Sequence, residues 1–263
     1  MYQLTVTIVT YKTDLHLLKK ALQSVIEDCF DAYLIIVDNN SGKVYFDALK
    51  ENLHDFNVNL YSTKKNGGYG YGHNYAEKHC PPSRFHLVMN ADIVVHKGSL
   101  IRMLDYMKKN SDISILSPKV LNPDGSLQYL NKREPTVIDI ILRRLVVGFL
   151  AKINFFQRRM HYYEMRDIGY DTNYNLTLAS GCFMLFDRKS FIKAKGFDEV
   201  FFMYFEDFDL SKRIIEFGGR IAYFSDSQVT HYWERSSSKN FFLFMSLIKS
   251  SIIYFNRWGW KLW

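Results

Sequence analysis

Apolar runs and amphipathic stretches alternate along the first part of the chain. Strand-like runs occupy residues 4–11, 34–41, 58–63 and 85–92, and helix-like stretches follow them at 15–26, 43–53, 72–79 and about 98–109. Two parallel strands must be joined by a crossover, which is usually a helix. The alternation therefore predicts an α/β fold with a Rossmann-like, mostly parallel sheet flanked by helices.

The pattern after residue 117 is less regular. A Pro-Asp-Gly-Ser sequence at 123–126 predicts a turn between two strand-like segments. Beyond it lie an apolar, aromatic and basic stretch (136–160), a strand-like run (176–188), a helix ended by glycines (205–219), a strand (220–227), a polar loop (230–239) and a closing amphipathic helix (241–258). Because neither repeats nor linkers interrupt the chain, we predict one domain over residues 1–263.

Composition and charge narrow the class of protein and of partner. Apolar residues make up 48% of the chain and charged residues 23%, which is typical of a globular domain. The net charge of +7 favours an anionic partner, either a phosphorylated small molecule, an anionic lipid or a nucleic acid. No RNA-recognition, zinc-finger or basic-zipper pattern is present in the sequence, so we expect no nucleic acid partner.

Cysteine usage and hydropathy predict where the protein works. Cys29, Cys80 and Cys182 lack metal-ligand spacing, and we interpret them as the reduced thiols of a cytosolic protein. The N-terminal residues lack the pattern of a signal peptide. No apolar run reaches the ~18 residues that a membrane span needs. We therefore expect a cytoplasmic protein.

Polar residues follow the ends of the predicted strands. Asp38 and Asn39 follow the second strand, the glycine-rich segment 66–74 (NGGYGYGHN) the third, and Asn90 and Asp92 the fourth. Ligands of a doubly wound sheet bind beyond the carboxyl ends of its strands, so these residues are expected to share a site. A surface turn is the alternative for the glycine-rich segment. A dinucleotide fingerprint is excluded because a tyrosine occupies the position of its last small residue.

Several carboxylates suit catalytic or metal-binding chemistry. Asp92 could ligate Mg²⁺ or Mn²⁺, and Asp38 could accept hydrogen bonds from a base or a ribose, although a turn explains either residue as well. Glu206, Asp207 and Asp209 begin a predicted helix and exceed what capping requires. Adjacent helical residues point about 100° apart. One of Glu206 and Asp207 can therefore serve as a general base while the other braces the scaffold.

His231 and Arg235 lie in the predicted polar loop near residue 230. A single histidine is more often structural than functional. Near a diphosphate, however, an imidazole can ligate a metal and a guanidinium can clamp phosphate oxygens.

The order of these motifs resembles the family 2 glycosyltransferases of GT-A fold, and among them the bacterial rhamnosyltransferases of O-antigen and capsule assembly. The likeness covers about residues 3 to 235, and its most specific part is FFMYFEDFDLSKRIIEFG after GFDE. The resemblance implies a nucleotide-binding half (1–117), an acceptor-binding and catalytic half (118–235) and a C-terminal helical extension (236–263).

The resemblance also implies roles for individual residues. Asp207 would be the catalytic base, with Glu206 beside it, and Asp92 the metal ligand, with His231 beside the diphosphate. The positions implied to hold or border the nucleotide-sugar are Thr10, Tyr11, Asp38, Asn39, Asn66, Gly67, Gly68, His73, Asn74, Asn90, Ala91 and Arg235, and those implied to border the acceptor pocket are Gly181, Cys182 and Phe183. Asn90 departs from the commoner motif, which has Asp there, so metal affinity is expected to be lower.

The activity implied by the resemblance is an inverting, metal-dependent sugar transfer with Mg²⁺ or Mn²⁺ as cofactor. We expect L-rhamnose to pass from dTDP-rhamnose to a lipid-linked oligosaccharide in bacterial surface polysaccharide synthesis. The alternative donors are UDP- or GDP-activated galactose, glucose, mannose or fucose. The alternative of another class is a non-catalytic nucleotide-sugar-binding or glycan-binding protein.

Two basic and aromatic segments suggest a membrane surface as a further partner. Residues 136–160 carry five arginines and lysines among apolar residues, and the C-terminal segment carries Trp258, Trp260 and Trp263 with basic neighbours. Amphipathic helices of this composition bind anionic membranes, and ordinary core packing is the alternative. We expect peripheral association with the inner face of the cell membrane.

Overall fold

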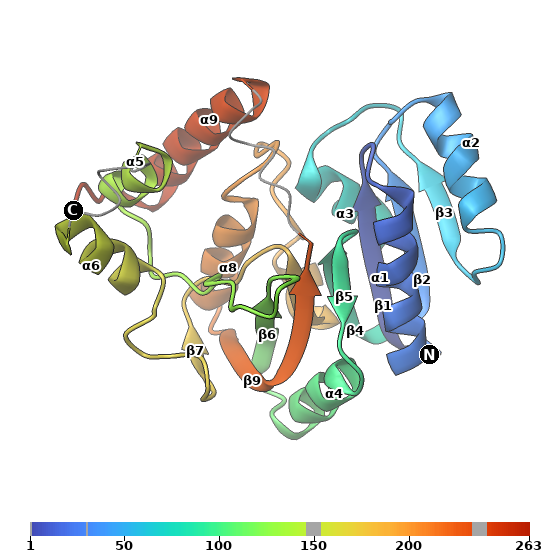
Figure 1. Cartoon of the computed structure of the whole chain (residues 1–263), viewed down its shortest axis with the longest axis horizontal. Helices are drawn as coiled ribbons and strands as arrows, with labels where there is room; N and C mark the ends of the chain where they lie inside the picture. The colour runs from blue at the N-terminus through green and yellow to red at the C-terminus, as the bar shows by residue number, and fades with distance from the viewer. Residues whose placement is uncertain (1, 30, 146–153, 233–240) are drawn as a thin grey trace.

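A computed structural model describes residues 2–29, 31–145, 154–232 and 241–263 of the chain (Figure 1). The strands are β1 (Tyr2–Thr10), β2 (Tyr33–Asp38), β3 (Asn59–Ser62), β4 (Ser83–Asn90), β5 (Ile93–Val95), β6 (Ile113–Leu121), β7 (Tyr174–Leu176), β8 (Phe183–Asp187) and β9 (Arg220–His231). The helices are α1 (Leu15–Asp28), α2 (Lys43–Asn52), α3 (Tyr69–Glu77), α4 (Ser99–Lys109), α5 (Val137–Leu145), α6 (Asn154–Tyr163), α7 (Arg188–Lys193), α8 (Glu206–Glu216) and α9 (Phe241–Trp258).

One mixed sheet runs through both halves of the chain. Its order within the described residues is β3-β2-β1-β4-β8-β6-β9-β5, with β7 on the side of β9. The pairs β3-β2, β2-β1 and β1-β4 are parallel, as the βα alternation predicts. Beyond β4 the chain adds antiparallel pairs, beginning with β8 on β4. The predicted α/β fold is confirmed, and its regular parallel part lies in the first half.

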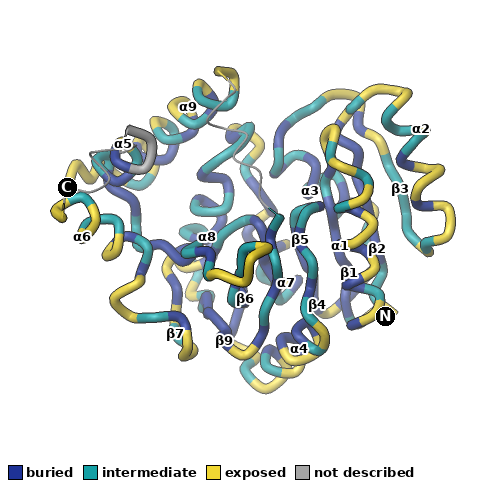
Figure 2. Tube along the Cα trace, viewed as in Figure 1, coloured by how far each residue is buried: buried dark blue, intermediate teal, exposed yellow. Residues whose placement is uncertain are grey.

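Helices cover both faces of this sheet, which is why the central strands are apolar on both sides. Leu87 of β4 packs with α1, α2 and α4 on one face. Val88, its neighbour, packs with α7 and α8 on the other face, where α3 also covers β1 and β2. Figure 2 shows the resulting gradient, with buried strands and exposed outer turns on α2, α4 and α9.

The glycine-rich segment is less of a loop than the sequence predicts. Helix α3 begins at Tyr69, three residues before the expected start at 72, so only residues 66–68 lie outside it. A Cβ on Gly72 would lie 2.6 Å from a methyl group of Val9 in β1, and glycine therefore lets the helix lie close against the sheet.

The C-terminal helix α9 lies at the edge of the second half of the chain, beside α5 and α8 (Figure 1). Its buried face packs Tyr254 and Phe255 against Phe201 and Phe205. Among the described residues, no helix combines the length and the apolar character needed to cross a membrane.

The basic segment 136–160 forms parts of α5 and α6. Arg159, one of the charges expected at a membrane, instead donates from Nε to Oδ1 of Asp139 over 2.6 Å, and this carboxylate is almost fully buried. For this residue, the alternative of internal packing is correct, because a buried carboxylate requires a paired cation.

Candidate active site

Segments from four parts of the chain meet at the carboxyl end of β4. The Asn90 N–H donates to the Cys182 carbonyl over 2.9 Å. The Gly181 N–H donates to Oδ2 of Asp207 over 2.8 Å, and the Tyr69 hydroxyl donates to the Gly181 carbonyl. The short turn before β8 therefore joins the end of β4, the start of α3 and the start of α8.

Asp92 and Asp207 face this same turn. Burial raises the pKa of the Cys182 thiol to about 12, and the charges of Asp92 and Asp207 both contribute to that rise. Two carboxylates that act on one thiol must lie close to it, since such interactions fall off with distance. The two candidate carboxylates thus lie near the same turn.

Asp207 is held by main-chain groups. Its Oδ2 accepts the Gly181 N–H, and its Oδ1 accepts the Phe208 N–H over 2.9 Å. The side chain remains partly exposed. Hydrogen bonds from N–H groups favour the charged form of a carboxylate and set its direction. This arrangement suits a group that takes a proton from a bound hydroxyl.

Glu206 has the opposite environment. It is 6% exposed, and within the described residues its Oε2 has no hydrogen-bond partner. Burial, and then the charge of Asp207, raise the pKa of the Glu206 carboxyl well above its ordinary value. Because burial disfavours the charged form of Glu206, Asp207 is the better placed of the two carboxylates to act as a base.

Asp92 and His231 form the second polar group of the site. Oδ1 of Asp92 lies 3.4 Å from Nε2 of His231. The Gln128 side chain fixes the ring, because its Nε2 donates to the His231 carbonyl while its Oε1 lies 3.0 Å from Nδ1. An amide oxygen only accepts, so Nδ1 carries a proton and Nε2 is the ring nitrogen that faces Asp92.

This pair suits a divalent cation. An octahedral Mg²⁺ with ligands at about 2.0–2.1 Å places neighbouring ligand atoms about 3 Å apart, close to the Asp92–His231 separation of 3.4 Å. A carboxylate with an imidazole also suits Mn²⁺. Within the described residues no cluster of three or more acidic, His or Cys side chains could hold a metal, so water and substrate oxygens would complete the coordination.

The two other residues of the metal motif differ in role. Asn90 places Nδ2 3.5 Å from Nε2 of His231 and is partly exposed at the site. Ala91 is 5% exposed and packs into the core, so only its main chain can reach a ligand.

The predicted nucleotide-binding residues gather at the ends of β1 and β2. Thr10 and Asp38 are paired in register across these strands, and both are buried. Asp38 accepts hydrogen bonds from the Ser41 N–H and the Ser62 hydroxyl. Tyr11, at 49% exposed, is the group in this corner most available to stack on a base.

Asn39 and Asn66 bind the protein itself. The Asn39 amide donates to Oδ1 of Asn66 over 3.0 Å and to the Gly68 carbonyl over 2.8 Å. Oδ1 of Asn66 also accepts the Gly68 N–H. These bonds fasten the start of α3 to the end of β2. The two side chains therefore support the predicted nucleotide site at the ends of β1 and β2 instead of contacting a ligand themselves.

The packing of Gly68 explains the glycine-rich pattern of residues 66–74 better than contact with a nucleotide-sugar does. Its φ is +96°, and a Cβ there would lie 1.9 Å from the Phe202 carbonyl oxygen. Gly67 precedes it, and a Cβ at Gly67 would meet the Tyr71 ring. Gly68 and Gly70 are needed because they pack against Phe202 and Phe197 of the segment that leads into α8, as Gly72 is needed against β1.

His73 and Asn74, both expected to contact the donor, also make contacts within the protein. His73 has no exposed surface, and its Nδ1 lies 3.0 Å from the Thr7 hydroxyl. Burial holds the pKa of His73 well below its ordinary value, so the ring is neutral. The Asn74 amide donates to the Phe197 carbonyl and accepts the Phe197 N–H. The expectation for His73 is corrected, because α3 buries its ring. Asn74 is partly exposed, and its amide is engaged by Phe197 and by Oε1 of Glu199.

The remaining predicted residues are Gly181, Cys182, Phe183 and Arg235. Gly181 lies at the site, where a Cβ would be 3.3 Å from that of Asp207. Cys182 is 8% exposed beside it, whereas Phe183 begins β8 and packs in the core. Arg235 lies outside the described residues.

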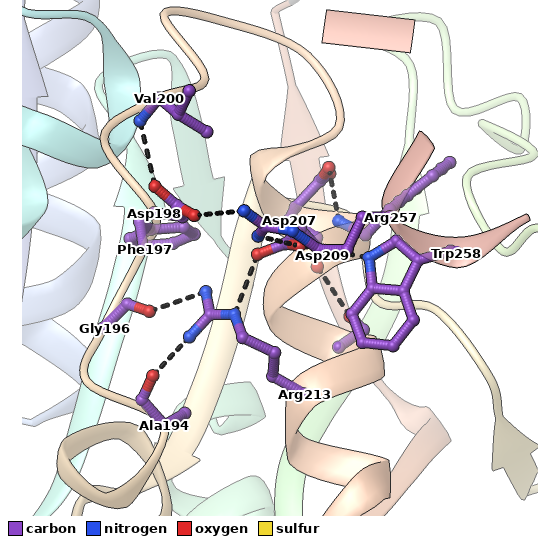
Figure 3. A network of polar contacts seen from close by, with 12 residues as sticks. Ala194, Gly196, Phe197, Asp198, Val200, Asp207, Asp209, Arg213, Arg257 and Trp258 are labelled. Carbon is purple, nitrogen blue, oxygen red and sulfur yellow. Dashed lines mark hydrogen bonds and ion pairs between the residues drawn. The ribbon is translucent and has the colours of Figure 1, made fainter. Parts of the chain in front are cut away.

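Sequence reasoning missed three groups that shape the site. Tyr69 was hidden in the glycine-rich segment, and Gln128 is 103 residues from the histidine it orients. Asp209 was noted at the start of a predicted helix without a role of its own, whereas it has no exposed surface and accepts hydrogen bonds from Arg213, Arg257 and Trp258 (Figure 3). Of these pairings, only that of Asp209 with Arg213, four residues apart on one helix, follows a local pattern.

Comparison with known proteins gives one family. A family model described as glycosyl transferase family 2 matches residues 5–194. An N-acetylglucosaminyl-diphospho-decaprenol L-rhamnosyltransferase of Mycobacterium tuberculosis H37Rv is 27% identical over 158 residues, which cover 59% of this chain and 48% of that protein. The rhamnosyltransferase WbbL of Escherichia coli K12 is 27% identical over 254 residues, which cover 91% of this chain and 88% of that protein.

Solved structures share the fold at low identity. GalNAc-T7, solved with UDP, GalNAc and Mn²⁺, matches with a TM-score of 0.67 and 16% identity over 90% of this chain and 44% of that one. TarS of S. aureus matches with a TM-score of 0.60 and 14% identity over 88% of this chain and 37% of that one. The chain thus spans about half the length of the mycobacterial relative and less than half of these structures.

Proposed function

Because the chain belongs to glycosyl transferase family 2, we propose that it transfers a sugar from a nucleoside diphosphate donor with inversion at the anomeric carbon. The observation that carries this proposal is the placing of Asp207, a carboxylate aimed by two N–H groups, at the same turn as Asp92. A single displacement at the anomeric carbon needs a base on the side of the acceptor hydroxyl and a group that neutralises negative charge on the side of the leaving diphosphate.

The chemical step follows from this arrangement. Asp207 takes the proton of an acceptor hydroxyl while that oxygen forms a bond to the anomeric carbon. The bond from this carbon to the diphosphate breaks on the opposite face, and the electron pair leaves with the diphosphate. A glycosidase needs an acid to protonate its leaving group. A diphosphate is weakly basic, so one base is enough here.

Asp92 and the Nε2 atom of His231 would hold a Mg²⁺ or Mn²⁺ ion. A cation bound there supplies positive charge against the developing charge on the diphosphate. Gln128 contributes by keeping the His231 ring in the tautomer whose Nε2 can ligate.

We propose L-rhamnose from dTDP-rhamnose as the donor, and a lipid-linked saccharide of bacterial O-antigen or capsule synthesis as the acceptor. The names of the relatives support this choice, since two of them are rhamnosyltransferases and one name includes a diphospho-decaprenol acceptor. A UDP- or GDP-sugar is the alternative donor.

A lipid-linked acceptor places the protein at the inner face of the cell membrane, and α9 offers a surface for it. The residues Phe241, Met245, Ile248 and Ile252 recur at helical spacing and are all exposed, by 37% to 76%. Lys249 lies among them and is also exposed. Exposed apolar side chains with a basic neighbour match an anionic membrane surface.

Release of nucleoside diphosphate tests the activity. Purified protein is incubated with dTDP-rhamnose and with UDP- and GDP-sugars, with and without acceptor lipid, in Mg²⁺, Mn²⁺ or chelator. We expect acceptor-dependent release that the chelator abolishes and that is fastest with dTDP-rhamnose. Asp207→Asn should lower turnover about 10²- to 10⁴-fold, the usual range for a lost base. Binding of donors without any release would favour the glycan-binding alternative.

A further inference from the structure

The catalytic helix α8 begins from a strained turn. Tyr204 and Phe205, the two residues before it, both have positive φ, at +71° and +67°. Neither is a glycine, and a bulky residue in this region is held there only by its surroundings. Asp207 follows two residues later, so the conformation of this turn sets where its carboxylate points.

The C-terminal helix α9 contacts this turn on both sides. Before the turn, the Ser250 hydroxyl donates to the Met203 carbonyl over 2.9 Å. At the turn, the Tyr254 ring packs on the Phe205 ring, with centroids 5.0 Å apart.

After the turn, two donors from the end of α9 converge on one carboxylate oxygen. Arg257 Nη1 and Trp258 Nε1 reach Oδ1 of Asp209 at 2.7 and 3.1 Å (Figure 3). Arg213 occupies the other oxygen, at 2.8 Å, and continues to the Gly196 carbonyl. The second arm of Arg257 pairs with Asp198 at 2.8 Å. Asp209 is fully buried, so all its charge is balanced by these side chains.

We infer that α9 is a positioning element for catalysis: Arg257 and Trp258, acting through Asp209, hold the strained turn in the conformation that aims Asp207 at the acceptor hydroxyl. This inference rests on the proposed role of Asp207 as the base. Arg257 and Trp258 bind Asp209 and not the substrate. We therefore expect them to affect turnover only by setting the orientation of α8.

The geometry explains why a helix about 50 residues further along the chain is needed. Two left-handed residues in succession favour relaxation of the turn, and Asp207 would move with it. A displacement of about 1 Å at a catalytic group can cost up to about 100-fold in rate. Fastening Met203, Phe205 and Asp209 to one rigid helix removes that freedom.

A matched pair of tryptophan variants tests the inference. Trp258→Phe keeps an aromatic side chain but removes the N–H that Asp209 accepts, together with the rest of the five-membered ring of the indole. Trp260→Phe removes the same group from an exposed tryptophan that donates to Asn256 instead. We expect Trp258→Phe to lower kcat about 10-fold and to leave the donor KM within about twofold. Trp260→Phe should leave both unchanged.

A double-mutant cycle with Asp207→Asn separates positioning from general loss of structure. If α9 acts through Asp207, then Trp258→Phe has no further effect on the residual rate of the Asp207→Asn protein. Arg257→Lys, which keeps the charge, should retain more activity than Arg257→Gln. An unchanged kcat in Trp258→Phe and Arg257→Gln, or an equal loss in the Asp207→Asn background, would overturn the inference.

The same measurements distinguish this inference from the proposed function. Full turnover in Asp207→Asn would rule out Asp207 as the base, and with it the inference that α9 positions this residue. Lost turnover in Asp207→Asn with normal turnover in the α9 variants would remove the inference alone.

Discussion

The carboxyl of Glu206 is buried, while that of its neighbour Asp207 accepts two N–H groups at the edge of the site. Their types and spacing give no reason to prefer either as the base. Environment separates them, because burial disfavours the charged form of Glu206, whereas two N–H groups orient the partly exposed carboxylate of Asp207. The same contrast predicts how stability depends on pH.

Glu206→Gln should make the protein more resistant to rising pH. The folded state raises the pKa of Glu206 above its ordinary 4.5, so above that pH the folded chain holds a proton that the unfolded chain has lost. Stability then falls as pH rises toward the folded pKa, by up to about 1.4 kcal/mol per pH unit. Glutamine imitates the neutral acid and removes this loss.

Thermal or urea unfolding between pH 5 and 8 measures the effect. The stability difference between Glu206→Gln and wild type should grow with pH. Glu216→Gln, at the exposed end of the same helix, serves as the control and should run parallel to wild type. If stability depended on pH in the same way in all three proteins, Glu206 would be ionised in the folded state and the prediction would be wrong.

At the scale of elements, α3 and α9 fasten the catalytic half to its surroundings. The start of α3 reaches Phe202, since the Tyr69 N–H donates to the Phe202 carbonyl over 2.9 Å. Helix α9 holds Met203 and Asp209 on either side of the turn. The segment between Phe202 and Asp209, which carries the candidate base, is therefore fixed from two directions.

Gly68→Ala should disturb the site more than an equivalent change elsewhere. Gly42→Ala is the matched control, because both glycines have nearly the same φ, +96° and +98°, but a Cβ at Gly42 meets nothing within 4 Å. Both changes should cost about 1–3 kcal/mol for the left-handed backbone. Gly68→Ala should cost more, and lower turnover, because the new Cβ displaces the Phe202 carbonyl. Equal stability and activity in the two variants would contradict this prediction.

At the scale of the whole molecule, α9 runs along one side of the second half of the chain, and α2 lies at the opposite end of the view (Figure 1). The first turn of α9 lies close to the start of α3, because the Phe242 ring packs on the Phe202 ring with centroids 5.1 Å apart and the Phe202 carbonyl accepts the Tyr69 N–H. We propose that a membrane lies against the exposed apolar side chains of α9.

Vesicle sedimentation tests this orientation. The variant Ile248→Glu with Ile252→Glu should lower partition into anionic vesicles at least about tenfold, because each change removes about 1.5–3 kcal/mol of apolar burial. The control Val44→Glu with Ile192→Glu adds the same charge at exposed positions on α2 and α7 and should pellet like wild type. Equal losses in both variants would point to charge alone. No pelleting of wild type would remove the membrane proposal.

Local pattern in the sequence predicted the alternating strands and helices of the first half and placed polar residues at the ends of β2 and β4, but it missed β5 and α7 and put His231 in a loop instead of at the end of β9. Hydrophobic periodicity is set by each element's own neighbours in the chain, so it can be read without knowing the fold. The motif GFDE to EFGG likewise carried enough local identity to indicate the family.

Only the tertiary structure decided which of these residues face the site. It buried His73 and Glu206, tied Asn74 to Phe197, oriented His231 by Gln128 and held Asp209 from α9. Asp209 is 48 residues from Arg257, and His231 is 103 residues from Gln128. The register of distant elements brings such residues together, and a carboxylate or imidazole acquires its charge state only from the partners and the burial that this register provides.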